Sequence, residues 1–191
     1  MGSNNDISLK ALAKINLGLD VVRRREDGYH EVRMIMQTIH LYDRLDIKRT
    51  KEPGIQIQTN LSFLPVNENN LIYKAAKLLM DEFSITDGVS VKLDKRIPVA
   101  AGMAGGSTDA AAMLIGVNRL FSLGLTKRQL MERGVQIGAD VPYCIMRGTA
   151  LAEGIGEALS PLPPMVKCPV LIAKPSISVS TKFVYQNLKL D

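Results

Sequence analysis

The stretch PVAAGMAGGSTD, residues 98–109, is a glycine-rich loop that leads directly into an alanine-rich segment. Glycine adopts positive φ at little steric cost, so Gly102, Gly105 and Gly106 allow the backbone N–H groups around them to turn toward one point. The residues that follow, 107–121, have the composition of a helix. Because a helix N-terminus behind a cluster of free amides attracts anions, above all phosphate, the loop predicts a nucleotide phosphate as its ligand.

The start of this helix carries signals of its own. Ser107 or Thr108 suits the N-cap, and Asp109 would lie in the first turn, where the helix dipole favours negative charge. No lysine follows Gly106, which argues against a P-loop, and the glycine spacing differs from the dinucleotide fingerprint Gly-x-Gly-x-x-Gly. A second interpretation, in which the glycines only permit close helix packing, stays open from the residues alone.

Strand-like patterns come first along the chain and helix-like patterns follow. Apolar residues at alternate positions predict strands at 7–22, 29–40, 45–48, 55–59, 89–93 and 170–174, with a hairpin formed by 143–146 and 149–152. Apolar stripes of helical period and capping residues predict helices at 69–83, 107–121, 126–137 and 178–188. This order favours an α+β fold over a doubly wound sheet.

Composition narrows the class of protein. The 191 residues are 46% hydrophobic and 23% charged, as in ordinary globular proteins, and no apolar run approaches the length of a membrane span. The net charge is +5, but the basic residues are scattered and aromatic residues make up only 5%, which argues against a nucleic-acid partner. Cys144 and Cys168 are predicted to be reduced core residues, and no metal-ligand cluster is present. Without a hydrophobic leader at its start, the chain is expected to be cytoplasmic.

Two charged residues in apolar surroundings are candidates for chemistry. Asp140 lies among small and apolar neighbours just past a predicted helix, where a carboxylate could take a proton from a substrate hydroxyl as a general base. Lys14 interrupts an apolar strand, and its cation could orient that carboxylate. Two plainer interpretations stay open: Asp140 bonding local amides at a helix end, and Lys14 facing outward from its strand.

A third candidate is the turn Asp27-Gly-Tyr-His30. It joins Tyr29 to His30, and that combination of an aromatic face with a polar edge suits a nucleobase. A hairpin turn with a half-buried tyrosine would have the same sequence, so the pattern alone does not decide between the two.

Taken together, four motifs resemble the GHMP kinase superfamily, and most closely its 4-diphosphocytidyl-2-C-methyl-D-erythritol kinases. The motifs are AKINL at 13–17, DGYH at 27–30, the loop and helix start at 98–112, and GADVP at 138–142. They occur in the family's order, and the similarity runs over about residues 7–190. One substitution departs from the family's usual loop, in which Leu-Gly stands where this chain has Met103-Ala104. An alanine methyl is tolerated there if φ is negative.

The resemblance implies an ATP-dependent kinase that phosphorylates the 2-hydroxyl of the methylerythritol group, with Mg²⁺ expected. It implies Asp140 as the catalytic base with Lys14 as its partner, and no metal-ligating residues are assigned. ATP-binding positions implied by the family are Asn69, Asn70, Leu71, Pro98, Ala101, Gly102, Met103, Ala104, Gly105, Gly106, Ser107 and Thr108. Substrate-binding positions implied are Asn16, Tyr29, His30, Asp140, Thr181 and Tyr185, with the two tyrosines stacking on cytosine.

The same resemblance sets expectations for the whole chain. Residues 1–158 would form the GHMP kinase N-terminal ATP-binding domain, a ribosomal-protein-like α+β fold. Residues 159–191 would begin a C-terminal α+β domain on the substrate side. Because family members are longer, the chain is expected to be truncated at its C-terminus. The partner would be a small cytidine diphosphate substrate, and the chain a monomer or weak homodimer. Alternatives are a homoserine or mevalonate type of GHMP kinase, or a nucleotide-binding module without turnover.

Overall fold

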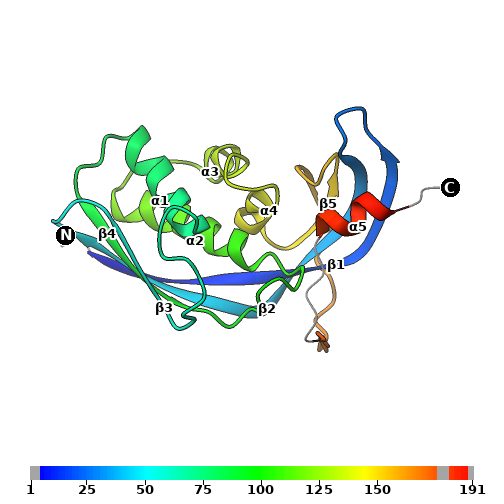
Figure 1. The fold of residues 1–191 in the computed structure, drawn as a ribbon, viewed down its shortest axis with the longest axis horizontal. Coiled ribbons are helices and arrows are strands. Elements are labelled where there is room, and N and C mark those ends of the chain that lie inside the picture. The colour runs from blue at the N-terminus through cyan, green and yellow to red at the C-terminus, as the bar shows by residue number, and fades with distance from the viewer. Residues whose placement is uncertain (1–4, 176–180, 189–191) are drawn as a thin grey trace.

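The computed structural model of the chain describes residues 5–175 and 181–188 (Figure 1). Its frame is a mixed six-stranded sheet in the order β3-β4-β2-β5-β6, with β1 paired along the other side of β2. Helices α1 to α4 gather on one face of this sheet, and α5 lies apart from them, beside the β1–β2 hairpin (Figure 1). The predicted α+β class is therefore confirmed.

The first two strands form one long antiparallel hairpin. β1 spans Asp6–Arg24 and β2 spans His30–Thr50, so β2 runs without a break through the two strands predicted at 29–40 and 45–48. The register shifts between Leu12 and Lys14, between Asn16 and Gly18, and between Val21 and Arg23. Such irregularities bend and twist a strand without ending it, which explains why β1 can curve over its whole length.

The remaining strands extend the sheet on both sides of β2. β3 (Ile55–Thr59) pairs in parallel with β4 (Gly88–Asp94), and α1 (Leu71–Glu82) makes the crossover between them. β5 (Thr149–Glu153) pairs with β2, and β6 (Ala158–Pro161) pairs with β5. The sheet thus continues across the predicted domain boundary at 158, and that boundary stays a prediction.

The central helix α2 (Gly105–Leu120) lies very close to the sheet. Ala110, Ala111 and Ala112 are fully or almost fully buried, and a Cβ added to Gly116 would overlap the side chain of Ile47 on β2. Small residues on this face let the helix approach, so most of the apolar core lies between α2 and the sheet. The helices α3 (Lys127–Gly134) and α4 (Val141–Met146) then pack on α2.

Three predictions of local structure are wrong. Residues 143–146 belong to α4 rather than to a hairpin, because Pro142 suits a helix start and a four-residue apolar run fits a helix or a strand equally well. Residues 170–174 form no strand, and Leu171 is 98% exposed with no sheet to cover it. Cys144 is buried as expected, whereas Cys168 is exposed.

The last helix agrees with prediction where it can be compared. α5 spans Thr181–Asn187, inside the predicted range 178–188, of which residues 178–180 lie outside the described residues. Among the helices of the described ranges, none is long and apolar enough to span a lipid bilayer.

Candidate active site

A cleft of about 620 Å³ opens where α1, α2 and α4 begin. Fifteen of the predicted site residues line it, although they come from segments far apart in the chain: Lys14, Asn16, Asn69, Asn70, Leu71, Pro98, Ala101, Gly102, Met103, Ala104, Gly105, Gly106, Ser107, Asp140 and Tyr185. Thr108, Tyr29 and His30 are not among its lining residues, and the side chain of Thr181 lies outside the described residues.

The glycine loop leaves the start of α2 open to this cleft. The helix begins at Gly105, and its N-cap is Ala104 with no side-chain hydrogen bond. The predicted N-cap at Ser107 or Thr108 is therefore wrong, and because the helix starts earlier, Asp109 lies beyond its first turn. Its first intrahelical bond runs from the Thr108 N–H to the Ala104 carbonyl at 2.8 Å. Amides of the turn before that bond have no partner within the helix, and they point out of its N-terminus, where an anion is favoured.

The loop reaches this geometry through several left-handed residues. Gly102 has φ 69°, and Ala100 and Ala104 have φ 53° and 55°. An alanine was expected to be tolerated at 104 if φ is negative, and φ is positive there. The backbone of Ala104 is therefore strained, because a side-chain methyl group is disfavoured at positive φ. The strained alanine turns the chain into α2 where the family's usual residue would be glycine.

Gly105 and Gly106 serve close packing as well. A Cβ on Gly105 would lie 2.8 Å from the Lys95 Nζ, and a Cβ on Gly106 would lie 3.3 Å from Leu71 on α1. The plainer interpretation of the glycines thus holds for these two positions. It does not compete with the phosphate interpretation, since close packing fixes the turn whose amides face the cleft.

Lys14 is buried, contrary to the interpretation of an outward-facing strand residue. Its side chain belongs to a residue only 6% exposed, lines the cleft, and donates to Asn16 Oδ1 at 3.2 Å. Its backbone N–H donates to the Met103 carbonyl at 3.2 Å, which ties β1 to the glycine loop. The strand irregularity beside Lys14 is the local feature that places a charged side chain on the cleft side.

Asp140 lines the same cleft from the N-cap position of α4. Its side chain makes no capping hydrogen bond, so the interpretation as a helix-end aspartate bonding local amides is not supported. No ion pair joins it to Lys14 within the described ranges, but the charges of both residues act on the nearby Cys144 thiol. A partly buried carboxylate without a protein partner is available to a ligand.

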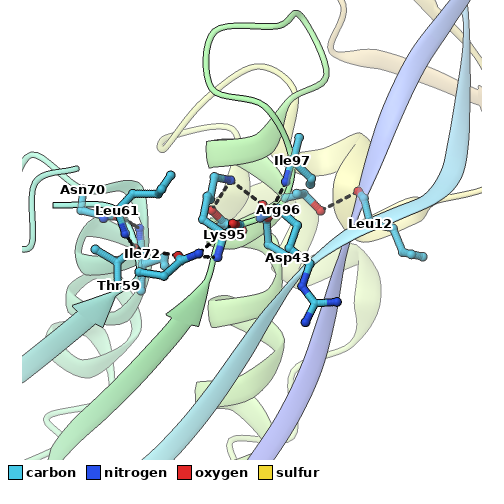
Figure 2. A network of polar contacts seen from close by, with 12 residues as sticks. Leu12, Asp43, Thr59, Leu61, Asn70, Ile72, Lys95, Arg96 and Ile97 are labelled. Atoms are coloured by element: carbon cyan, nitrogen blue, oxygen red, sulfur yellow. Dashed lines mark hydrogen bonds and ion pairs between the residues drawn. The ribbon is translucent and has the colours of Figure 1, made fainter. Parts of the chain in front are cut away.

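Behind the loop lies a buried ionic network that the sequence did not reveal (Figure 2). The Lys95 ammonium pairs with Asp43 and, at 2.8 Å, with Asp109, and all three residues are more than nine-tenths buried. Asp43 Oδ1 also accepts the N–H groups of Arg96 and Ile97 at 2.6 and 2.7 Å. The network therefore holds the segment that leads from β4 into the glycine loop.

One oxygen of this network has no partner. Asp109 Oδ1 is buried without a hydrogen bond, and burial raises the pKa of Asp109 well above its usual range despite the nearby Lys95. With Asp109 protonated, one ammonium faces one carboxylate and the buried charges balance. Lys95 and Asp109 both line the cleft, so the network is also its inner wall.

The polar residues at the start of α1 differ in whether the fold already uses the hydrogen bonds of their side chains. Asn70 caps α1, accepting the Ile72 N–H at 2.9 Å and donating to the Pro65 carbonyl at 2.7 Å, so its side chain is used by the fold. Asn69 lines the cleft, and its backbone N–H donates to Asn67 Oδ1. Thr108 is likewise structural, because its hydroxyl donates to the Leu12 carbonyl at 2.8 Å.

Of the three predicted aromatic site residues only Tyr185 lines the cleft, and its ring contacts His30. The rings of His30 and Tyr185 have centroids 5.2 Å apart, and Tyr185 lines the cleft. Tyr29 is 62% exposed, and its backbone N–H donates to Asp27 Oδ1 in the turn. The structure therefore brings His30, rather than Tyr29, against Tyr185.

The cleft offers an oxygen ligand for a divalent cation that is bound together with phosphates. No group of three or more His, Cys, Asp or Glu side chains that could hold a metal occurs in the described part of the chain. Mg²⁺ usually takes only one or two protein oxygens and fills its other positions with phosphate and water. The Ser107 hydroxyl lines the cleft, and it fits that requirement.

Comparisons with known proteins agree with this arrangement. Residues 70–148, which include the glycine loop, match the GHMP kinases N terminal domain. A solved 4-(cytidine 5'-diphospho)-2C-methyl-D-erythritol kinase is 34% identical, with a TM-score of 0.79, over 96% of this chain and 65% of its own. A homoserine kinase from Cytophaga hutchinsonii, at 18% identity and a TM-score of 0.70, shares the fold.

The fold and the loop define the N-terminal domain of a GHMP kinase. Two curated relatives named 4-diphosphocytidyl-2-C-methyl-D-erythritol kinase are 65% and 63% identical, from Lachnoclostridium phytofermentans and Lachnospira eligens. The matches cover 97% and 95% of this chain, but 64% and 63% of the relatives. Within the GHMP kinases, the chain is thus similar to 4-diphosphocytidyl-2-C-methyl-D-erythritol kinases, and it spans just under two thirds of the length of these relatives.

Proposed function

We propose that the protein transfers the γ-phosphoryl group of ATP to the 2-hydroxyl of 4-diphosphocytidyl-2-C-methyl-D-erythritol, a step of non-mevalonate isoprenoid synthesis. The names of the relatives support the substrate. The observation that carries the reaction is the single cleft in which the glycine loop, Lys14 and Asp140 meet. Phosphoryl transfer depends mainly on positioning and charge stabilisation, and such a cleft provides both.

The glycine loop would hold the triphosphate. The open N-terminus of α2 offers amides and a favourable dipole to the β- and γ-phosphates. Asn69, Asn70 and Leu71 would lie on the adenine side, with Asn70 acting through the start of α1 because its side chain is already bonded. Mg²⁺ would neutralise phosphate charge when bound, held by the phosphates with the Ser107 hydroxyl within reach of the same cleft.

Lys14 and Asp140 would act on the acceptor. As the substrate oxygen bonds to the γ-phosphorus and ADP leaves, Asp140 accepts the hydroxyl proton. The ammonium of Lys14 would lower the cost of negative charge on that oxygen, and Asn16, which accepts a hydrogen bond from Lys14, would fix its direction. The buried position of Lys14 keeps the cation aimed into the cleft.

The aromatic end of the cleft would select cytidine. Tyr185 would stack on the base and His30 would bond its polar edge, while Tyr29 would close over the base from the exposed hairpin turn. Neither homoserine nor mevalonate has a base to stack. The His30–Tyr185 pair therefore favours the cytidine substrate over those alternatives.

The direct test is acceptor choice. ATP consumption would be measured with Mg²⁺ and each of three acceptors: 4-diphosphocytidyl-2-C-methyl-D-erythritol, homoserine and mevalonate. Because this chain spans 64% of its relative, the assay would also be run on the sequence extended to the relatives' full length. Turnover restricted to the cytidine substrate is expected. Turnover with another acceptor alone would contradict the proposal, and ATP binding without turnover in the extended chain would favour a binding module.

A further inference from the structure

A second cleft, of about 580 Å³, lies between the open edge of β1 and the helices α2, α3 and α4. It shares no lining residue with the glycine-loop cleft. Its floor is apolar and its rim carries cations. The floor is formed by Leu9, Ala112, Ile115, Leu130 and Ile145.

The cations of this second cleft have no carboxylate to balance them. Arg119, Lys127 and Arg147 line it, and none of the lining residues of the described chain is Asp or Glu. Arg147 Nη2 donates to the Lys10 carbonyl at 2.9 Å, and Lys127 Nζ donates to the Met146 carbonyl at 2.5 Å. Carbonyl oxygens satisfy donors without neutralising charge, so the positive potential of the cleft is left uncompensated.

Arg119 and Arg147 also act on each other. Burial lowers the pKa of the Arg147 guanidinium, and the positive charge of Arg119 lowers it further. This repulsion would be relieved by an anion placed between the two groups. The side chain of Lys10 contacts an aromatic ring instead, since its ammonium lies 4.5 Å from the centre of the Tyr42 ring.

The backbone at Arg147 is strained. With φ 63° and ψ 177°, the residue occupies a region that is otherwise nearly confined to glycine. An arginine held there keeps its guanidinium at the cleft, bonded to β1. Strain of this kind at a charged residue in a cleft is commoner at binding sites than elsewhere.

We propose that this second cleft binds a small phosphate-bearing anion, with the phosphate between Arg119, Lys127 and Arg147. A guanidinium matches a phosphate with two parallel hydrogen bonds, and a lysine adds a compact charge. The volume suits a small ligand, and the apolar floor suits an organic group attached to the phosphate. The site does not depend on the proposed kinase function.

The test uses phenyl phosphate and inorganic phosphate as probes, titrated into the isotope-labelled chain while backbone amide signals are followed by NMR. Two groups of signals separate the two clefts: those of Lys127 and Arg147, and those of the glycine loop. We expect saturable shifts in the first group. Tighter binding of phenyl phosphate would identify an organic phosphate as the occupant, and equal binding would identify free phosphate.

Arg147→Gly is the informative variant, because glycine relaxes the backbone while removing the charge. It is expected to keep the thermal midpoint of unfolding and to weaken binding by at least about tenfold, as is Arg119→Gln. The matched control is Arg128→Ala on α3, an exposed cation paired with Glu132, which should leave affinity within about twofold. Shifts confined to the glycine loop, or equal affinity in parent, Arg147→Gly and Arg119→Gln, would overturn the proposal.

Discussion

At the scale of single residues, Asp43, Lys95 and Asp109 place three ionisable side chains where water is excluded. One ammonium serves two carboxylates, and Asp109 Oδ1 has no hydrogen bond at all. Asp43 is the better satisfied of the two acids, because it also accepts two backbone N–H groups. Burial raises the pKa of Asp109 well above its usual range, which favours a proton on that carboxyl.

Asp109→Asn should reveal that proton. A carboxyl whose pKa is raised by folding keeps its proton in the folded protein at pH values where the unfolded chain has lost it. Its contribution to the free energy of unfolding therefore falls as pH rises from the ordinary pKa of 3.8 through the raised folded pKa. The variant has no carboxyl group to ionise, so its free energy of unfolding does not fall in this way. As pH rises, its stability relative to the parent should therefore improve by about 1.4 kcal/mol per unit of pKa shift. Urea denaturation between pH 4 and 8 measures the difference.

The paired control is Asp43→Asn. Replacing this acceptor leaves the buried Lys95 ammonium without a firmly charged partner, which should cost about 3–5 kcal/mol at pH 7. Parallel pH profiles for Asp109→Asn and the parent would show that Asp109 is ionised when folded. A small effect of Asp43→Asn would show that it is not the acid that balances Lys95.

Single residues also show which parts of the candidate site could be predicted from the sequence and which could not. The apolar neighbours of Lys14 and Asp140 mark both as unusual, and the structure places both in the cleft. Lys95 lies in the charged run DKR at 94–96, which is typical of a solvated turn. Only the long-range contacts to Asp43 and Asp109 reveal that it is buried, and no spacing rule reports such contacts.

At the scale of elements, the loop-to-helix turn before α2 is the critical unit. Gly102 needs its positive φ, and a Cβ added there would meet nothing within 4 Å, whereas Gly105 lacks room, with Lys95 Nζ at 2.8 Å and Ile97 at 3.2 Å. Gly102→Ala should therefore cost about 1–2 kcal/mol through backbone strain alone. Gly105→Ala should cost about 1–3 kcal/mol and also displace Lys95.

Nucleotide affinity separates these two glycine variants. Gly105→Ala should weaken ATP binding, measured by calorimetry, by more than its stability loss explains, because it disturbs the wall behind the phosphates. Both variants would be compared at a temperature where each is fully folded. Unchanged ATP affinity in Gly105→Ala would mean that the Lys95 network does not support the loop.

Elements were predictable where local chemistry fixes them. The helix of α1, the strand β3 and the capping box of α3, in which Thr126 and Gln129 bond reciprocally, follow from patterns in a few residues. The start of α2 was not predictable, because Ala104 takes the left-handed conformation that sequence rules assign to glycine. The continuity of β2 was also missed, since its pairing with β1, β4 and β5 overrides local interruptions.

At the scale of the whole molecule, the cleft joins the first strand, the central loop and the last helix. α5 lies beside the β1–β2 hairpin (Figure 1), which brings Tyr185 to His30. Because Tyr185 lines the cleft and Tyr29 is mostly exposed, Tyr185→Ala should weaken binding of the cytidine substrate by about 1–3 kcal/mol. Tyr29→Ala should weaken binding of the same substrate by less. Calorimetry with the substrate and with ATP measures both.

ATP is the internal control for that comparison. Its affinity should be the same in parent, Tyr185→Ala and Tyr29→Ala, since both tyrosines are assigned to the base of the acceptor substrate and not to ATP. Equal substrate affinity in the parent and Tyr185→Ala would remove the tyrosine from the base pocket. A larger loss in Tyr29→Ala would show that the hairpin turn closes over the base.

Fold class and family followed from four motifs in order, and the comparisons confirm both. The sequence could not show that Lys14 and Asp140, 126 positions apart, would share one cleft, because sequence separation carries no distance. The domain boundary at 158, the cytoplasmic location and the monomeric or weakly dimeric state remain predictions.

The most direct test of the account is phosphoryl transfer by the parent and by Asp140→Asn, with Mg²⁺, ATP and 4-diphosphocytidyl-2-C-methyl-D-erythritol, on the sequence extended to the relatives' length. The amide cannot accept the hydroxyl proton, so the variant should lose about 10²–10⁴-fold in kcat while its ATP affinity stays unchanged. Turnover within a few-fold of the parent would contradict the central claim that Asp140 is the base of this cleft.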